Sequence, residues 1–137
     1  MDSKDFDYLI DEAIRVRRNA YVPYSGYSVG AAVLTENGNI YKGCNVENQS
    51  YGLTICAERN AVFSAVAAGE RHIKAIAIVG SFRGEEITDY AYPCGACRQV
   101  IAEFSDSDTV VIVAKSIDDY KKFTIAELLP ECFTFLS

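Results

Sequence analysis

The chain of 137 residues carries a formal net charge of −6, and half of its residues are apolar. This predicts one globular domain over residues 1–137, and the acidic balance argues against a non-specific nucleic-acid binder, which would carry a basic surface. No apolar stretch approaches the ~18 residues that span a bilayer, and the polar N-terminus lacks an apolar signal core, so we expect a cytoplasmic protein without membrane contacts.

Nine elements are predicted in chain order: helix, strand, strand, helix, strand, helix, strand, strand, helix. Apolar residues spaced by three and four indicate the helices, short apolar runs the strands, and Asn37-Gly38 a tight turn between the first two strands. The predicted bounds are 5–20, 28–34, 40–44, 55–68, 75–79, 94–104, 109–114, 121–123 and 125–129.

Helices that alternate with buried strands predict a three-layer α/β/α sandwich. The short, continuous apolar strands at 75–79 and 109–114 indicate burial on both faces of the sheet. The opening hairpin adds an antiparallel pair, so the five-stranded sheet is expected to be mixed. No linker divides the chain.

Five cysteines stand at positions 44, 56, 94, 97 and 132. An odd number that includes a Cys-x-x-C pair favours metal or redox chemistry over a disulfide framework. Cys94 and Cys97 belong to the Pro-Cys-x-x-Cys motif at 93–97, and Cys56 opens a Cys-Ala-Glu motif. We expect Cys44 and Cys132 to be packed thiols.

Cys56, Cys94 and Cys97 can together hold one zinc ion. Structural zinc sites usually have four protein ligands, whereas catalytic sites keep a position open for water. Both motifs stand at predicted helix starts, where partial positive charge favours thiolates, and two helices entering the same end of a sheet would bring them together. The pattern predicts an open, hydrolytic zinc site.

Glu58 is not expected to bind the metal. A carboxylate beside such a site can take a proton from water and pass it to a substrate nitrogen and then to a leaving amine. Three thiolates leave zinc with excess negative charge, which Arg59 would offset. A redox pair or a structural zinc site would explain Cys94 and Cys97 alone, but neither needs Cys56 or Glu58.

Asn45 and Glu47 follow the second predicted strand, and strand alternation puts them on one face. A carboxylate and an amide side by side can grip the vicinal hydroxyls of a ribose. A capping loop explains the same residues about equally well.

In these motifs, the chain closely resembles the small cytidine deaminases that bind zinc through three cysteines and form homotetramers. The matching segments lie in the family's order and cover nearly the whole chain: 20–30, 43–48, 56–61, 93–100 and 127–130. The zinc motifs are typical of the wider deaminase superfamily, and Asn-x-Glu-Asn at 45–48 narrows the resemblance to enzymes of free nucleosides.

The resemblance implies that Zn²⁺ is held by the three cysteines, with Glu58 moving protons. The implied substrate contacts are the Ala57 N–H to the pyrimidine 2-oxo group, the Tyr92 carbonyl to the departing amine, Asn45 and Glu47 to the ribose 3′-hydroxyl, and Tyr27 to the base. Arg59 and Gln99 would hydrogen-bond the thiolates. Tyr51 and Phe133 would lie near a neighbouring subunit's pocket in the homotetramer.

Three positions differ from the family's usual residues: Tyr27 replaces Phe, Gln49 replaces Ala and Tyr92 replaces Ser or Thr. The predicted reaction is hydrolytic deamination of cytidine and deoxycytidine to uridine and deoxyuridine with release of ammonia, a step of pyrimidine salvage. The alternatives are a deaminase of a blasticidin-type nucleoside antibiotic, a deaminase of bases in nucleic acid, and a non-catalytic zinc or redox module. The acidic chain and the ribose pattern argue against the second of these.

Overall fold

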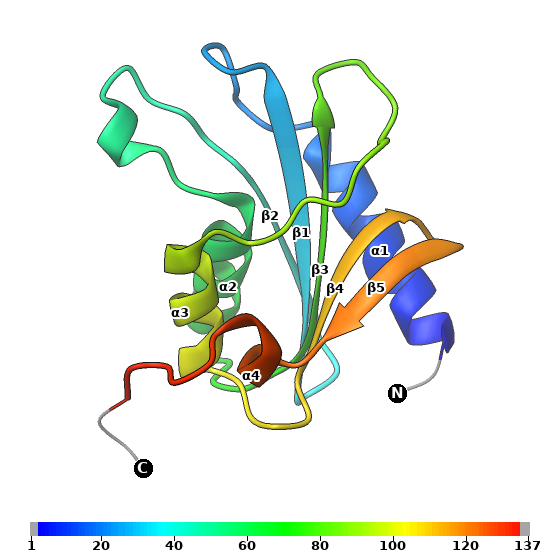
Figure 1. The fold of residues 1–137 in the computed structure, drawn as a ribbon, viewed down its shortest axis with the longest axis vertical. Helices are drawn as coiled ribbons and strands as arrows, with labels where there is room; N and C mark the ends of the chain where they lie inside the picture. Colours follow the sequence, from blue (N-terminus) through cyan, green and yellow to red (C-terminus); the bar gives the residue numbers. More distant parts are fainter. Residues whose placement is uncertain (1–2, 135–137) are drawn as a thin grey trace.

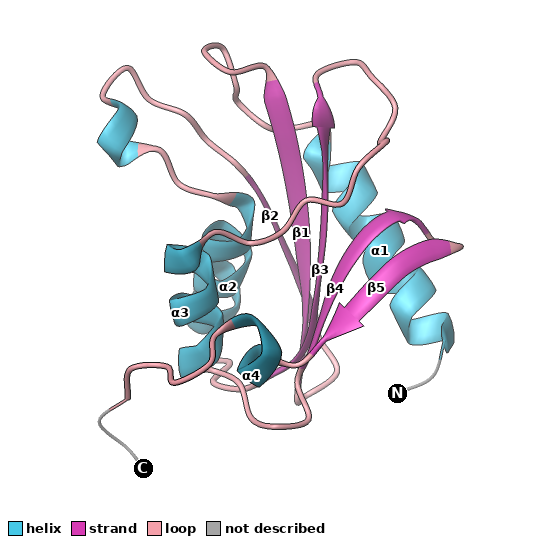
Figure 2. Cartoon of the chain, in the orientation of Figure 1, coloured by secondary structure: helices cyan, strands magenta, loops and turns pink. Residues whose placement is uncertain are grey.

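The computed structural model describes residues 3–134. Helices and strands follow the predicted order (Figures 1 and 2). Their bounds are α1 (Ser3–Arg17), β1 (Tyr27–Thr35), β2 (Ile40–Cys44), α2 (Ala57–Ala67), β3 (Ile73–Phe82), α3 (Gly95–Glu103), β4 (Val110–Ser116), β5 (Asp119–Phe123) and α4 (Ile125–Leu128), with a 3₁₀ turn, η1 (Tyr51–Leu53), before α2.

The five strands form one mixed sheet in the order β2-β1-β3-β4-β5, in which β3 and β4 are parallel and the other neighbours antiparallel. Helix α1 covers one face, and α2 and α3 lie side by side on the other (Figure 1). This arrangement confirms the three-layer α/β/α sandwich. Within residues 3–134, no helix has both the length and the apolar character needed to cross a bilayer.

Strand β3 shows how alternation builds the two cores. Ala75, Ala77 and Val79 pack with α1. Ile76 and Ile78 point the other way and pack with α2 and α3. Because both faces are covered, the strand reads as a continuous apolar run, and small residues on the α1 side leave room for that helix.

Two strand glycines set how closely the helices approach the sheet. A Cβ added at Gly43 in β2 would lie 2.4 Å from the backbone nitrogen of Ala61 and 2.7 Å from the backbone oxygen of Ala57. A Cβ at Gly30 in β1 would lie 2.1 Å from the carbonyl oxygen of Ala13. A side chain at Gly43 would therefore push the first turn of α2 off the sheet, and that turn carries Glu58.

Several predicted boundaries were wrong. Helix α2 begins at Ala57 rather than at 55, because Ile55 pairs with Val46 as an isolated antiparallel bridge, with both N–H···O distances 3.0 Å. Helix α1 ends at Arg17, after which the chain tightens into a turn whose Ala20 N–H bonds three residues back. Strand β3 extends beyond 75–79 at both ends, because the long β1 strand pairs along its full length.

Glu70 anchors the β1–β2 hairpin from the far end of α2. Its carboxylate is 5% exposed and accepts hydrogen bonds from Asn39 Nδ2 and Asn37 Nδ2, both at 2.8 Å, and from the Tyr41 hydroxyl at 3.1 Å. The hydrogen bond from Asn39 is the largest of the effects that lower the pKa of Glu70. A lowered folded-state pKa means that the ionised carboxylate stabilises the fold above the unfolded-state pKa.

Glu70→Gln is expected to lower the Tm at neutral pH, because the amide removes the charge and turns one acceptor into a donor that faces other donors. The Tm difference from wild type should start to shrink as the pH falls below about 4.3, the ordinary pKa of an unfolded-state glutamate, and it should be lost once the pH falls through the lowered pKa of folded Glu70. Thermal unfolding of both proteins between pH 3 and 7 measures this. Glu36→Gln, an exposed change in the same hairpin, is the matched control. A Tm difference that does not vary with pH would contradict the role of the charge.

Candidate active site

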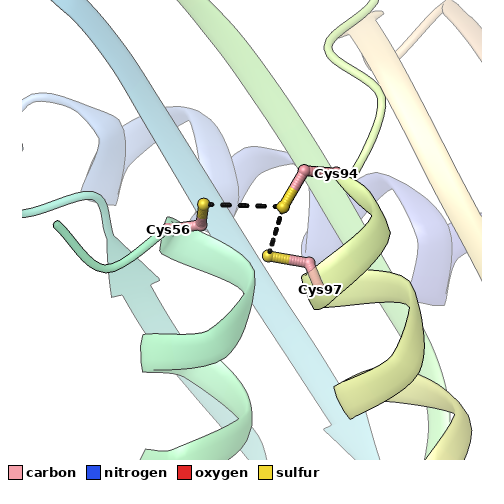
Figure 3. A group of neighbouring side chains, drawn as sticks. All are labelled: Cys56, Cys94 and Cys97. Carbon is pink, nitrogen blue, oxygen red and sulfur yellow. Dashed lines mark hydrogen bonds between the residues drawn. The ribbon is translucent and has the colours of Figure 1, made fainter. Parts of the chain in front are cut away.

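Two helices on the same face of the sheet each begin directly after a cysteine. Cys56 is the N-cap of α2 and Cys94 the N-cap of α3, both in extended backbone conformation. Cys97 lies one turn into α3 and is fully buried. The sulfur atoms of all three point toward one another (Figure 3). The first N–H groups of both helices lack acceptors within the helix, so partial positive charge gathers where thiolates would lie.

The spacing of the three sulfur atoms fits a zinc ion. Cys94 Sγ lies 3.9 Å from Cys56 Sγ and 3.5 Å from Cys97 Sγ, and all three sulfurs lie within 4.8 Å of one another. Tetrahedral Zn–S bonds of about 2.3 Å place sulfur atoms roughly 3.8 Å apart. All five cysteines are free thiols, so no disulfide competes for this group.

The cluster favours a thiolate at Cys56. A hydrogen bond from Cys97 is the largest effect that lowers the pKa of Cys56 to about 5, and the Arg59 guanidinium adds to it. Arg59 Nη2 donates to Cys56 Sγ at 3.4 Å. The arginine thus lies where it can offset the negative charge that three thiolates would bring to a divalent metal.

Glu58 lies in the first turn of α2 beside this cluster. Its side chain is only 4% exposed, and burial raises its pKa to about 7. A carboxyl group that titrates near neutral pH can both accept and return a proton there, which an exposed glutamate with an ordinary pKa does less well. The site therefore combines a metal-binding group with a proton carrier.

A cleft of about 350 Å³ opens in front of Glu58. This is within the range of small-molecule sites. Besides Cys56 and Cys94, it is lined by all the residues for which contacts with the base were predicted: Tyr27, Ala57, Glu58 and Tyr92. Asn45 lines it too. Ala57 is the first residue of α2, so its N–H lacks a helical acceptor and is available to a ligand.

Asn45 and Glu47 do not line the same cavity. Glu47 lines a second pocket of about 430 Å³. Both side chains bond to the chain itself: Asn45 Oδ1 accepts from Val29 N and its Nδ2 donates to the Tyr27 carbonyl, each at 2.9 Å. Glu47 accepts from the Tyr24 and Ser25 backbone nitrogens at 3.0 and 3.2 Å and from Ser25 Oγ at 2.6 Å.

The side chain of Gln99 hydrogen-bonds a backbone carbonyl instead of the predicted thiolate. Its Nε2 donates to the Phe133 carbonyl at 3.1 Å. Two residues turn an α-helix by about 200°, so Gln99 leaves α3 nearly opposite to Cys97. The side chain of Phe133 is 66% exposed, and that of Tyr51, which packs edge-on against Tyr24, is 75% exposed. Cys132 is also exposed, which makes its prediction as a packed thiol wrong.

The sequence motifs did not predict some of the residues that line the cleft, namely Val29, Thr54, Ile78, Tyr90 and Ala91. Tyr90 belongs to the irregular segment before Cys94, and the β4–β5 hairpin fixes its place. The ammonium groups of Lys115 and Lys121 lie 4.7 and 4.5 Å from its ring centre, and its hydroxyl donates to Asp119. These contacts stabilise the rim of the cleft. No motif in the sequence predicts them.

Known proteins are similar to this chain in sequence and in fold. Residues 3–114 match the family model described as the cytidine and deoxycytidylate deaminase zinc-binding region. A cytidine deaminase of Sporosarcina psychrophila is 48% identical over 130 residues, which cover 95% of this chain and 92% of that protein. The crystal structure of cytidine deaminase from Burkholderia pseudomallei superposes with a TM-score of 0.82 at 45% identity, over 92% of this chain and 97% of that one.

A more distant relative bears on the choice of substrate. Blasticidin-S deaminase of Bacillus cereus is 32% identical over 111 residues, which cover 79% of this chain and 78% of that protein.

Proposed function

The chain belongs to the cytidine and deoxycytidylate deaminase family, and from this we propose that it hydrolyses cytidine and deoxycytidine to uridine and deoxyuridine, releasing ammonia. The observation that carries the proposal is Glu58: a buried carboxyl group with a pKa of about 7, beside three clustered thiols at a cleft large enough for a nucleoside. A redox pair or a structural zinc site needs no such acid.

Zinc is the cofactor that this donor set fits, and Cys56, Cys94 and Cys97 would hold it. When bound, zinc lowers the pKa of a water molecule so that hydroxide is available at neutral pH. Arg59 and the two helix N-termini reduce the negative charge of the thiolates, which would otherwise make that water a poorer acid.

Glu58 moves the protons of the reaction. It takes one proton from the attacking water and delivers it to N3 of the pyrimidine, which favours addition at C4. It then takes the second proton of the water and delivers it to the amine, which leaves as ammonia. Water and cytidine are consumed, and uridine and ammonia are formed, without any change of oxidation state. The near-neutral pKa of Glu58 suits both halves of this cycle.

The other residues orient the nucleoside. The free N–H of Ala57 donates to the 2-oxo group, the ring of Tyr27 lies against the base, and the Tyr92 carbonyl accepts from the amine. Asn45 and Glu47 bind the ribose 3′-hydroxyl, with the chain's own hydrogen bonds holding both side chains in place. The segment 90–92 keeps its position through the β4–β5 hairpin.

We also propose that residues 1–137 act as one domain in a cytoplasmic homotetramer that serves pyrimidine salvage. Free thiols that bind a metal need a reducing compartment, which supports the location. The exposed aromatic side chains of Tyr51, which lines the pocket of Glu47, and of Phe133 support contact with a second chain. Sizing chromatography tests this: a tetramer elutes near four times the 15.1 kDa of the chain, and elution as a monomer contradicts it.

The decisive experiment joins metal analysis to an ammonia-release assay with cytidine, deoxycytidine and blasticidin S. We expect about one zinc per chain and ammonia from both nucleosides at a higher kcat/KM than from the antibiotic. A strong preference for blasticidin S would overturn the proposal in favour of antibiotic deamination. Bound zinc without ammonia from any of the three would indicate a non-catalytic module. A gel shift with single-stranded RNA or DNA would expose a nucleic-acid enzyme.

A further inference from the structure

Thr54 lies between the two cavities of the site. It lines the cleft that also contains Asn45 and Glu58, and it lines the neighbouring pocket that contains Glu47. The residue ends the η1 turn, where its backbone N–H donates to the Tyr51 carbonyl at 3.2 Å. This hydrogen bond helps to position Thr54, a half-buried residue that lines both spaces.

The polar side chains beside Thr54 already have partners in the chain. Both polar atoms of the Asn45 amide are bonded to the backbone of β1. Both carboxylate oxygens of Glu47 accept hydrogen bonds from the segment 24–25. Each keeps some capacity for a ligand, because an amide nitrogen has two hydrogens and a carboxylate about four lone pairs.

The hydroxyl of Thr54 differs from these groups. It forms no hydrogen bond with any residue in the range 3–134. A hydroxyl can donate one hydrogen bond and accept two, so the full capacity of this one is available to water or to a ligand. Thr54 thus offers an unused donor and acceptor at the border of the two cavities.

We propose that the Thr54 hydroxyl binds the 2′-hydroxyl of the ribose and so sets the preference for cytidine over deoxycytidine. This inference rests on the proposed function, in which Asn45 and Glu47 take the 3′-hydroxyl. The 2′-hydroxyl is attached to the adjacent carbon, so it must lie close to those two side chains. Thr54 shares one cavity with Asn45 and the other with Glu47, and its hydroxyl is free.

The test compares Thr54→Val, which keeps the shape but loses the hydroxyl, with Thr54→Ser, which keeps the hydroxyl. For Thr54→Val we expect kcat/KM for cytidine to fall roughly fivefold relative to that for 2′-deoxycytidine, the loss expected for one hydrogen bond between neutral groups. Thr54→Ser should retain most of the wild-type ratio. Deoxycytidine, measured on the same enzyme preparation, corrects for any general loss of folding or zinc.

A third substrate identifies the hydroxyl that is bound. 3′-Deoxycytidine keeps the 2′-hydroxyl, so Thr54→Val should lower its kcat/KM by about the same factor as that of cytidine. Equal losses on cytidine and deoxycytidine, or a loss that disappears with 3′-deoxycytidine, would overturn the inference. If the wild-type protein turns over none of these nucleosides, the proposed function fails first, and the two failures are thereby distinguished.

Discussion

Glu58→Gln is expected to lower kcat for cytidine by about 10³-fold while leaving the zinc content at the wild-type level. The amide has the same shape as the carboxyl group and can still form hydrogen bonds inside the cleft. It cannot take a proton from water or return one to N3 or to the amine. The loss should therefore appear in kcat, with a much smaller change in KM, in steady-state measurements of ammonia release.

Two further variants separate proton transfer from packing. Glu58→Asp keeps a carboxyl group but shortens the side chain by one methylene. We therefore expect its activity to lie between that of wild type and that of Glu58→Gln. Glu103→Gln, an exposed change on α3, is the matched control and should behave like wild type. Because a buried amide costs less than a buried charge, the Tm of Glu58→Gln should not fall. A loss of kcat below tenfold, with zinc bound, would show that another group carries the protons.

The order of the elements and the sheet could be predicted from the sequence because they depend on local patterns. Asn37-Gly38 forms the expected tight turn, with Gly38 at φ +85°, and β2 has the predicted bounds. The start of α2 could not be predicted in the same way. Ile55 continues the apolar pattern of the helix, but its backbone pairs with Val46, a contact that exists only once the preceding loop has folded back.

The same distinction applies to the site. The grouping of Cys56, Cys94 and Cys97 was predictable because two motifs at helix starts need only a shared sheet edge to meet. The bond from Gln99 to Phe133 joins residues 34 positions apart and depends on how the C-terminal segment lies over α3. Thr54 belongs to no motif, and its proposed role follows from two cavities that exist only in the folded chain.

Removal of the metal should destabilise the protein as well as inactivate it. The three thiols join the first turns of α2 and α3, so a bound zinc ion would cross-link two helices that otherwise meet through side-chain packing. Zinc that binds the folded chain and not the unfolded one adds its binding free energy to stability. We expect the chelated protein to lose activity and to unfold about 10 °C below the zinc-loaded form in thermal scans, with both properties restored by added zinc.

Cys97→Ala tests the same metal site by mutation instead of by chelation. Cys97 is fully buried and lies within 4 Å of Cys94 Sγ, so its replacement should abolish stoichiometric zinc binding and reduce kcat to near background. Cys132→Ala removes an exposed thiol outside the cluster and should keep one zinc per chain with wild-type activity. Metal analysis after gel filtration separates the two results. If Cys97→Ala retained one zinc per chain, the metal would have to lie elsewhere. Of the three clustered cysteines in residues 3–134, Cys56 and Cys94 are helix N-caps and Cys97 lies inside α3, so the variant would lose the ligand that α3 itself supplies.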